Sequence, residues 1–329
     1  MKRFLPFLVL PLTLFAADAP HPFSGSIERL DPAFDQIVPA TAQVEKLAEG
    51  FNWSEGPTWF QESVVFSDVP ENIIYQWKPG TTSAAVFLKP SGLLTPTPGF
   101  REQGSNGLGV DAEGRLLICQ HGERRVARWS KAGGFQSIAD RFEGKRFNSP
   151  NDLALRGNGE IYFTDPPYGL EGLDKSPLKE LGWNGVYRVA VDGKVSLLVK
   201  DINFPNGIAF SPDEKTLYVA VSDGKQPRVM AYDVQADGTV ANGRVFFDAT
   251  PLKNRKGSCD GMKVDGKGNV FATGPGGVLV ISPAGKHLGT ILTNEATGNC
   301  AWGDDGSTLY ITADMFLCRV KTATKGASR

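Results

Sequence analysis

Acidic and amide side chains recur along this chain at one place in a repeated pattern. Each stands before a short apolar stretch, a turn rich in Gly, Asp or Asn, and a run of β-branched and aromatic residues. Successive members are 39 to 55 residues apart, and none of them is Lys, Arg, His or Cys. We call them the lead residues: Glu55, Asn106, Asn151, Asn206, Asp260 and Asn299.

Two carboxylates and four amides suggest a site for a hard cation. Ca²⁺ takes about six to eight oxygen ligands of mixed charge, whereas zinc prefers His or Cys. Carboxylates gathered inside a protein also need a cation to offset their desolvation. A single Asn or Asp before Gly is most often a turn residue, but six in register favour convergence on one point. The set predicts one divalent cation, Ca²⁺ first, with Mn²⁺, Zn²⁺ or Mg²⁺ as alternatives.

The elements that must position these side chains are short strands. In five of the units a turn follows the lead residue by about five positions and another strand follows directly, as in a β-hairpin. Helical periodicity is nearly absent. About four short strands in each unit of about 50 residues are typical of a β-propeller. Six units predict an all-β, six-bladed β-propeller with a central metal-binding channel, and we expect Ser24 to Glu49 to supply the outer strand that closes the ring.

The composition agrees with this architecture and narrows the function. The 329 residues include 38 Gly and 22 Pro, so turns are frequent, and 41% are hydrophobic, which suffices for a large core. The formal charge of −1 gives no electrostatic reason to expect nucleic acid or an anionic membrane as a partner. Only three His are present, which disfavours a His-based triad. Gly directly follows four lead residues, at positions 56, 107, 207 and 261, where we expect it to let the backbone bend tightly beside the metal.

The first 19 residues read as a secretory signal. Two basic residues precede an apolar run from Phe4 to Phe15, and alanines up to Ala19 offer small residues for cleavage. The run is too short to span a bilayer. We expect residues 20–329 to form a single propeller domain that is periplasmic or secreted, with no membrane anchor after cleavage.

Export permits disulfides, and the four cysteines allow three pairings. Their spacing does not choose among them. One hypothesis is a bridge from Cys300 to Cys259 or to Cys318; the other is buried free thiols, above all for Cys119 and Cys318.

The lead residues lie within segments that resemble one known family. The segments are SEGPTW from Ser54, CQHGERRVAR from Cys119, NSPNDLA from Asn148, YFTDPPYGL from Tyr162, FPNGIAFSPDEKTLYV from Phe204 and CDGMKVD from Cys259. In this order they resemble the senescence-marker-protein/gluconolactonase family, also called regucalcin-like lactonases, and in particular its bacterial gluconolactonase branch. The resemblance covers nearly all of the chain after residue 19. It implies a six-bladed propeller with one divalent cation in the channel.

The resemblance also implies an activity and roles for individual residues. Metal ligands are implied at Glu55, Asn206 and Asp260, with Asn151 completing the shell or holding a substrate oxygen. The implied reaction opens sugar lactones such as glucono-1,5-lactone, with the metal as Lewis acid and Asp260 or Glu55 as base for the attacking water. The animal branch has an Arg two residues before the equivalent of Asn151, where this chain has Ser149. The sugar contacts of that branch therefore do not carry over.

Further residues are candidates for substrate binding beside Asn151. Asn106, as a lead residue, would point into the pocket and bind hydroxyl groups. His121 follows the strand-like LLIC and would either line the pocket or bond a loop, and Arg125 behind it could fix a sugar carboxylate or hydroxyls. Tyr168, in the DPPYGL segment, would either stack on a sugar ring or only pack.

Three other functions stay open from the sequence. A non-enzymatic propeller would bind a ligand or a protein, and its channel metal would only stabilise the fold. An organophosphate hydrolase of the diisopropyl fluorophosphatase type would use a similar metal shell. A quinoprotein dehydrogenase would need a channel His and a basic cluster, which the lead residues lack. The sequence does not decide the oligomeric state.

Overall fold

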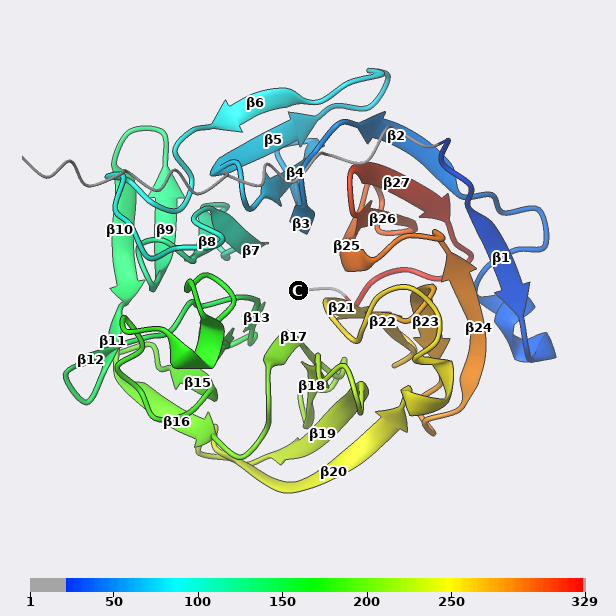
Figure 1. The fold of residues 1–329 in the computed structure, drawn as a ribbon. Helices are drawn as coiled ribbons and strands as arrows, with labels where there is room; N and C mark the ends of the chain where they lie inside the picture. Colours follow the sequence, from blue (N-terminus) through cyan, green and yellow to red (C-terminus); the bar gives the residue numbers. More distant parts are fainter. Residues whose placement is uncertain (1–21, 328–329) are drawn as a thin grey trace, which may run out of the picture.

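Six antiparallel sheets form a closed ring in the computed structural model, which describes residues 22–327 (Figure 1). In each sheet the first strand of the blade lies nearest the centre and the chain then moves outward strand by strand. No α-helix occurs among the described residues. The six-bladed, all-β propeller is confirmed, and the predicted signal segment 1–19 lies outside the described residues.

The first three blades follow one another along the chain. Blade 1 contains β3 (Ser54–Phe60), β4 (Ser63–Asp68), β5 (Ile73–Trp77) and β6 (Ala85–Leu88). Blade 2 contains β7 (Ser105–Val110), β8 (Leu116–Gln120), β9 (Arg125–Ser130) and β10 (Gly134–Ala139). Blade 3 contains β13 (Leu153–Leu155), β14 (Ile161–Asp165), β15 (Gly185–Val189) and β16 (Val195–Val199).

The remaining blades complete the ring. Blade 4 contains β17 (Pro205–Phe210), β18 (Thr216–Val221), β19 (Arg228–Val234) and β20 (Val240–Asp248). Blade 5 contains β21 (Met262–Val264), β22 (Val270–Gly274), β23 (Gly277–Ile281) and β24 (His287–Leu292), extended by β1 (Ser26–Arg29). Blade 6 contains β25 (Thr297–Gly303), β26 (Thr308–Ala313), β27 (Phe316–Lys321) and, as its outer strand, β2 (Glu45–Glu49).

The ring is closed by the segment before blade 1. Strand β2 pairs antiparallel with β27, so one sheet joins an early and a late part of the chain, as the sequence predicts. The same segment adds β1 to the edge of blade 5, where Glu28 accepts two hydrogen bonds from Arg255, at 2.8 and 2.9 Å. Two neighbouring blades are therefore held by one stretch of chain.

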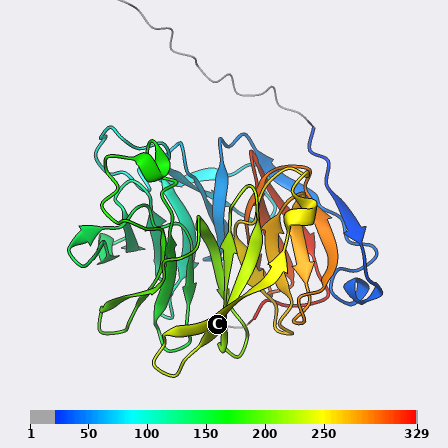
Figure 2. The ribbon, with the colours of Figure 1, turned by 60° about the horizontal axis from the view of Figure 1, so that its bottom comes forward.

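Three short 3₁₀ helices and a small hairpin connect the blades. The helices are η1 (Pro32–Gln36), η2 (Leu173–Lys175) and η3 (Thr250–Leu252), and the hairpin consists of β11 (Arg141–Phe142) and β12 (Lys145–Arg146). Figure 2 shows η2 and η3 on the same face of the ring. Within residues 22–327 there is no helix with the length and apolarity needed to cross a membrane.

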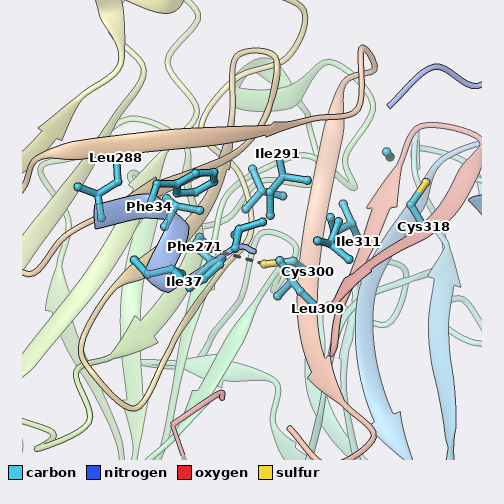
Figure 3. Packing of buried hydrophobic residues seen from close by; sticks show 14 of the residues in the cluster. Phe34, Ile37, Phe271, Leu288, Ile291, Cys300, Leu309, Ile311 and Cys318 are labelled. Carbon is cyan, nitrogen blue, oxygen red and sulfur yellow. Dashed lines mark hydrogen bonds between the residues drawn. The ribbon is translucent and has the colours of Figure 1, made fainter. Parts of the chain in front are cut away.

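The core lies between adjacent blades, because the second strand of each blade is almost entirely buried. Between blades 5 and 6, Phe271, Ile291, Cys300 and Ile311 are completely buried in one cluster with Phe34 of η1. Figure 3 shows Cys300 directed into this cluster, with its Sγ 3.6 Å from the Phe271 carbonyl oxygen. Such packing of flat apolar faces is what holds neighbouring blades together.

The four cysteines are buried free thiols, so the hypothesis of a disulfide is wrong. Cys300 and Cys318 both face Ile311 on the strand between them. Two strand spacings of about 4.8 Å separate them, beyond the reach of about 7 Å between disulfide-bonded Cα atoms. Cys259 lies in a different cluster, between blades 4 and 5.

The glycines that follow lead residues make room for the next blade. A Cβ on Gly207 would stand 2.2 Å from the Asp260 carbonyl oxygen, and one on Gly261 would stand 1.9 Å from the Asn299 side chain. Of the four predicted positions only Gly56 has a positive φ, of 49°. Close approach between inner strands, rather than a tight bend beside a metal, therefore explains most of this pattern.

Candidate active site

The lead residues lie on neighbouring inner strands around the centre of the ring, and we call the place where they lie the mouth. Each lies in or directly before the inner strand of its blade, and these strands surround the centre of the ring (Figure 1). Asp260 is half-buried, whereas the other five lead residues are only 1% to 4% exposed. The structure therefore brings the segments that carry the lead residues together, and the roles predicted for their side chains stay predictions.

Hydroxyl groups on the second strand of one blade hydrogen-bond the backbone at or next to the lead residue of the next blade. Ser67 Oγ of blade 1 donates to the Asn106 carbonyl oxygen at 2.8 Å, and Thr164 Oγ1 of blade 3 donates to that of Asn206 at 2.7 Å. Thr273 Oγ1 of blade 5 donates to the Gly298 carbonyl oxygen, next to Asn299, at 2.9 Å. These bonds set the spacing of the lead residues around the mouth.

The mouth concentrates negative charge. Burial, together with the nearby charges of Asp152 and Glu102, raises the pKa of Glu55 to about 8. Burial raises the pKa of Asp260 well above its ordinary value, with repulsion from Glu55 as the next cause. The pKa of Glu102 is raised by burial as well. A cation held here would relieve all of these unfavourable interactions.

The oxygens at the mouth fit a hard cation. Among residues 22–327, Asn106 Oδ1 and Asn151 Oδ1 are buried oxygens that have no hydrogen-bond partner. In the same part of the chain no three His, Cys, Asp or Glu side chains are grouped so as to hold a metal by themselves. Amide oxygens would therefore have to complete the coordination, which is the mixed donor set that Ca²⁺ accepts.

Asp260 lies in a hydrogen-bonded group on one side of the mouth. Asn206 hydrogen-bonds the Asp260 carboxylate and donates from Nδ2 to Ser222 Oγ at 3.0 Å. The Tyr168 hydroxyl hydrogen-bonds Asn206 and Ser222, and its ring stacks on Phe204 with 5.7 Å between ring centroids. Burial and the Asp260 charge raise the pKa of Tyr168, so its hydroxyl stays protonated. Tyr168 thus lies beside the lead residues, as the sequence analysis expected of a pocket residue.

His121 and Glu102 lie on another side of the mouth. The His121 ring is completely buried, and neither ring nitrogen has a hydrogen-bond partner among the described residues. Its Nδ1 lies 3.7 Å from Glu102 Oε2, too far for a hydrogen bond. Burial, and then the charge of Arg101, lower the pKa of His121 to about 3, so the ring is neutral at pH 7.

Two loops hold this side of the mouth together. The backbone N–H of Arg101 donates to the Gly169 carbonyl oxygen at 3.0 Å, and Phe100 forms a β-bridge with Leu170. The loop before β7 is therefore fastened to the loop that carries Tyr168. As a result, Glu102 and Tyr168 are placed relative to each other by backbone contacts.

Arg125 is a predicted substrate residue that the structure does not bring to the mouth. It begins β9, two strands out from the channel-lining β7. Its Nε donates to Gln120 Oε1 at 2.6 Å, and its guanidinium lies over the Phe135 ring at 5.8 Å. The neighbouring Arg124 is likewise engaged, with Nε donating to the Phe147 carbonyl oxygen at 2.6 Å.

Two carboxylates at the mouth were missed from the sequence. Asp152 is 1% exposed and accepts a hydrogen bond from Asn299 Nδ2 at 3.3 Å. It follows the lead residue Asn151 directly, at the place where four other units have Gly, so the repeat itself held a signal. Glu102 lies in a loop outside the repeats, and no pattern in the sequence marked it.

A surface groove of about 670 Å³ is lined by residues of the segments 174–184 and 200–203 and by none of the lead residues. Two of its lysines are engaged by neighbouring groups: Lys179 Nζ donates to two backbone carbonyls, and Lys200 Nζ lies over the Trp183 ring at 5.7 Å. The groove brings together no set of reactive groups. The channel mouth is the better candidate for chemistry.

A six-bladed propeller whose carboxylates and amides meet at one channel mouth defines the class of this protein. The chain belongs to the SMP-30/gluconolactonase/LRE-like family, which it matches over residues 53–314. It is 39% identical over 316 residues to the gluconolactonase of Zymomonas mobilis, covering 92% of this chain and 87% of that one.

Solved structures of similar proteins agree with this family assignment. A gluconolactonase from Xanthomonas campestris is 30% identical, has a TM-score of 0.78, and covers 93% of this chain and 99% of its own. A calcium-binding regucalcin from Agrobacterium tumefaciens has a TM-score of 0.66 at 21% identity over 87% of this chain and 95% of its own, a likeness of fold. The protein is thus a lactone hydrolase.

Proposed function

We propose that this lactone hydrolase depends on a divalent cation, Ca²⁺ first, and opens sugar lactones such as glucono-1,5-lactone. The observation that carries the proposal is the interaction of Asp260 with Glu55, together with the buried, unpartnered amide oxygens of Asn106 and Asn151 in neighbouring inner segments. The relatives described as gluconolactonases support the substrate class. Such a substrate is small and uncharged, in keeping with the near-zero net charge of the chain.

Glu55, Asn151, Asn206 and Asp260 are the residues that would hold the cation. When bound, it supplies a Lewis acid for the lactone carbonyl oxygen. Glu55 is suited to holding the cation because its own oxygens are held in place. Its Oε2 accepts the Gly56 N–H at 2.9 Å, and the Trp53 side chain also hydrogen-bonds the carboxylate.

Asp260 is better suited than Glu55 to accept the proton of the attacking water. It is the one partly exposed lead residue, whereas Glu55 is only 2% exposed, and the raised pKa of the Asp260 carboxylate favours proton uptake. A general base has to lie within hydrogen-bonding reach of the proton it takes. Asn206 orients the Asp260 carboxylate by a hydrogen bond.

The substrate hydroxyl groups would contact the polar groups around the mouth. The Asn106 amide, the His121 ring nitrogens and the Glu102 carboxylate offer donors and acceptors on one side. The hydroxyl of Tyr168 offers another near Asp260. Direct contact by Arg125 has little support, because its guanidinium is engaged within blade 2.

A lactonase assay across sugar lactones tests the proposal, with chelator and then add-back of Ca²⁺, Mn²⁺, Zn²⁺ or Mg²⁺. We expect hydrolysis of glucono-1,5-lactone to fall to the spontaneous rate in chelator and to return with Ca²⁺. Full activity after chelation and dialysis would refute the metal dependence. Faster hydrolysis of an organophosphate than of any lactone would favour the diisopropyl fluorophosphatase type instead.

A further inference from the structure

Asp165, at the end of β14, holds the backbone that leads to Asn151. Its Oδ2 accepts the N–H of Asn148 and its Oδ1 accepts the N–H of Ser149, both at 2.8 Å. The side chain is completely buried. These two amides lie three and two residues before Asn151, so the carboxylate fixes the approach of the chain to that lead residue.

Asp68, at the end of β4, does the same before Glu55. Its Oδ2 accepts the N–H of Asn52 at 3.0 Å and its Oδ1 accepts the N–H of Trp53 at 3.2 Å. Asp68 is 1% exposed. The clamped amides again lie three and two residues before the lead residue, so the arrangement in blade 1 repeats that in blade 3.

The corresponding position in the other blades holds no carboxylate. It is the second-strand residue that faces the segment just before the lead residue, and it is Gln120, Val221, Gly274 and Ala313 in blades 2, 4, 5 and 6. The propeller fold therefore does not require an acid there. Burial raises the pKa of Asp165 to about 7 and also raises that of Asp68, so each buried carboxylate carries a desolvation cost.

We call Asp68 and Asp165, each with the two backbone amides it binds, the clamps. Both clamps connect to other groups at the mouth. In blade 1, Asp68 fixes the backbone of Trp53, whose side chain hydrogen-bonds the Glu55 carboxylate. In blade 3, Ser149 Oγ donates to the Pro166 carbonyl oxygen at 2.6 Å and accepts the Gly169 N–H at 2.9 Å. The second clamp thus also frames the loop that carries Tyr168.

We propose that Asp68 and Asp165 are positioning residues for the lactonase site. Each holds the loop before a lead residue so that the Glu55 carboxylate and the Asn151 amide oxygen face the channel. The inference rests on the proposed function, because one of its tests measures the binding of the proposed cation. Groups that orient metal ligands typically change metal affinity or activity by about 10- to 100-fold when they are replaced.

The test compares Asp68→Asn and Asp165→Asn with Asp223→Asn as a matched control. An amide has one acceptor oxygen, so either Asn variant loses one of the two backbone bonds at nearly constant volume. Asp223 also accepts two backbone N–H bonds, from Lys225 at 2.8 Å and Gln226 at 3.4 Å, but within its own turn of blade 4. Asp165→Glu keeps both acceptor oxygens and serves as a rescue variant.

Three quantities are measured: Ca²⁺ affinity of the chelator-treated protein by calorimetry, kcat and KM on glucono-1,5-lactone, and hydrogen exchange of the clamped amides. We expect Asp68→Asn and Asp165→Asn to weaken Ca²⁺ binding and to lower kcat by about 10- to 100-fold. Exchange should become faster at Asn148 and Ser149 in one variant and at Asn52 and Trp53 in the other. Asp223→Asn should stay within about twofold of the wild type, and Asp165→Glu should recover part of the loss.

Faster exchange with unchanged Ca²⁺ affinity and unchanged kcat in both variants would overturn the proposal, because the clamps would then only stabilise loops. If one variant fails to fold, the other clamp and the Asp165→Glu variant decide by the same criteria. Wild-type protein that hydrolyses lactone without binding Ca²⁺ would refute the metal assignment alone. In that case a loss of kcat in the Asn variants, against the Asp223 control, supports the positioning role and its absence overturns it.

Discussion

Blades 1 and 5 each bring one carboxylate to the channel mouth, but in different settings. Glu55 of blade 1 is 2% exposed, and its approach is clamped by Asp68 through two backbone bonds. Asp260 of blade 5 is half-buried, and the second-strand position that could clamp it is Gly274. The contrast teaches that a propeller can place equivalent residues at one point and still divide tasks among them. A rigidly held, buried residue suits cation binding, and a partly exposed one with a raised carboxylate pKa suits proton transfer.

The largest expected effect separates the two carboxylates by activity. Asp260→Asn should lower kcat by about 10²- to 10⁴-fold, since a general base contributes a factor of that size, while the unfolding temperature stays close to that of the wild type. Glu55→Gln should act mainly through weaker Ca²⁺ binding, so that high Ca²⁺ restores part of its activity. Steady-state kinetics over a Ca²⁺ titration measures both. Equal loss of kcat in the two variants at saturating Ca²⁺ would contradict the division of roles between Glu55 and Asp260.

A smaller effect concerns stability without metal. Burial raises the pKa of Glu55 to about 8 from the ordinary value of 4.5, so the folded protein keeps a proton that the unfolded chain releases. The stability that this proton confers is complete below about pH 4.5 and is lost as pH rises through about 8. We therefore expect the free energy of unfolding in chelator to fall by a few kcal/mol, to order of magnitude, between these pH values.

Urea unfolding in chelator from pH 5 to pH 9 checks this pH dependence. Glu55→Gln carries no charge and should flatten the decline, and added Ca²⁺ should oppose it by binding the ionised carboxylates. Stability that rises with pH across this range in the metal-free wild type would contradict the account of the buried Glu55.

The smallest expected effect concerns the Tyr168 hydroxyl, which lies near Asp260. Tyr168→Phe removes a hydroxyl that hydrogen-bonds Asn206 and Ser222 but keeps the ring stacked on Phe204. The hydrogen bond that this hydroxyl would make to the substrate is worth about 1 kcal/mol, so its loss should raise KM by about fivefold with little change in kcat. Kinetics on glucono-1,5-lactone gives the answer, and a drop in kcat as large as that of Asp260→Asn would instead make Tyr168 part of the chemistry.

The fold was predictable because the same sequence pattern recurs in all six units of the chain. Each unit shows the same lead residue, turn and strand, and errors in one unit are corrected by the others. The closing strand was predictable for a related reason, since a residual strand-like segment before blade 1 has to pair with the open edge of blade 6. The disulfide hypothesis failed because spacing along the chain does not tell that Ile311 separates Cys300 from Cys318.

The site was predictable only where its residues belong to the repeat. Asn299 rather than Cys300 faces Asp152 at the mouth, a choice that depends on strand register. Glu102 comes from a loop whose place is set by backbone bonds to Gly169 in another blade. Arg125 looked like a substrate contact beside His121, but it begins the third strand of its blade, two strands away from the channel.

The sequence by itself determined a ring of six blades and predicted the six side chains at its mouth, because both follow from a pattern repeated along the chain. Tertiary structure alone decided which groups outside the pattern join them: Glu102, the orientation of Tyr168, and the Asp68 and Asp165 clamps. The physical reason is that these groups are placed by contacts between loops and blades distant in sequence. Such contacts leave no periodic trace in the order of residues.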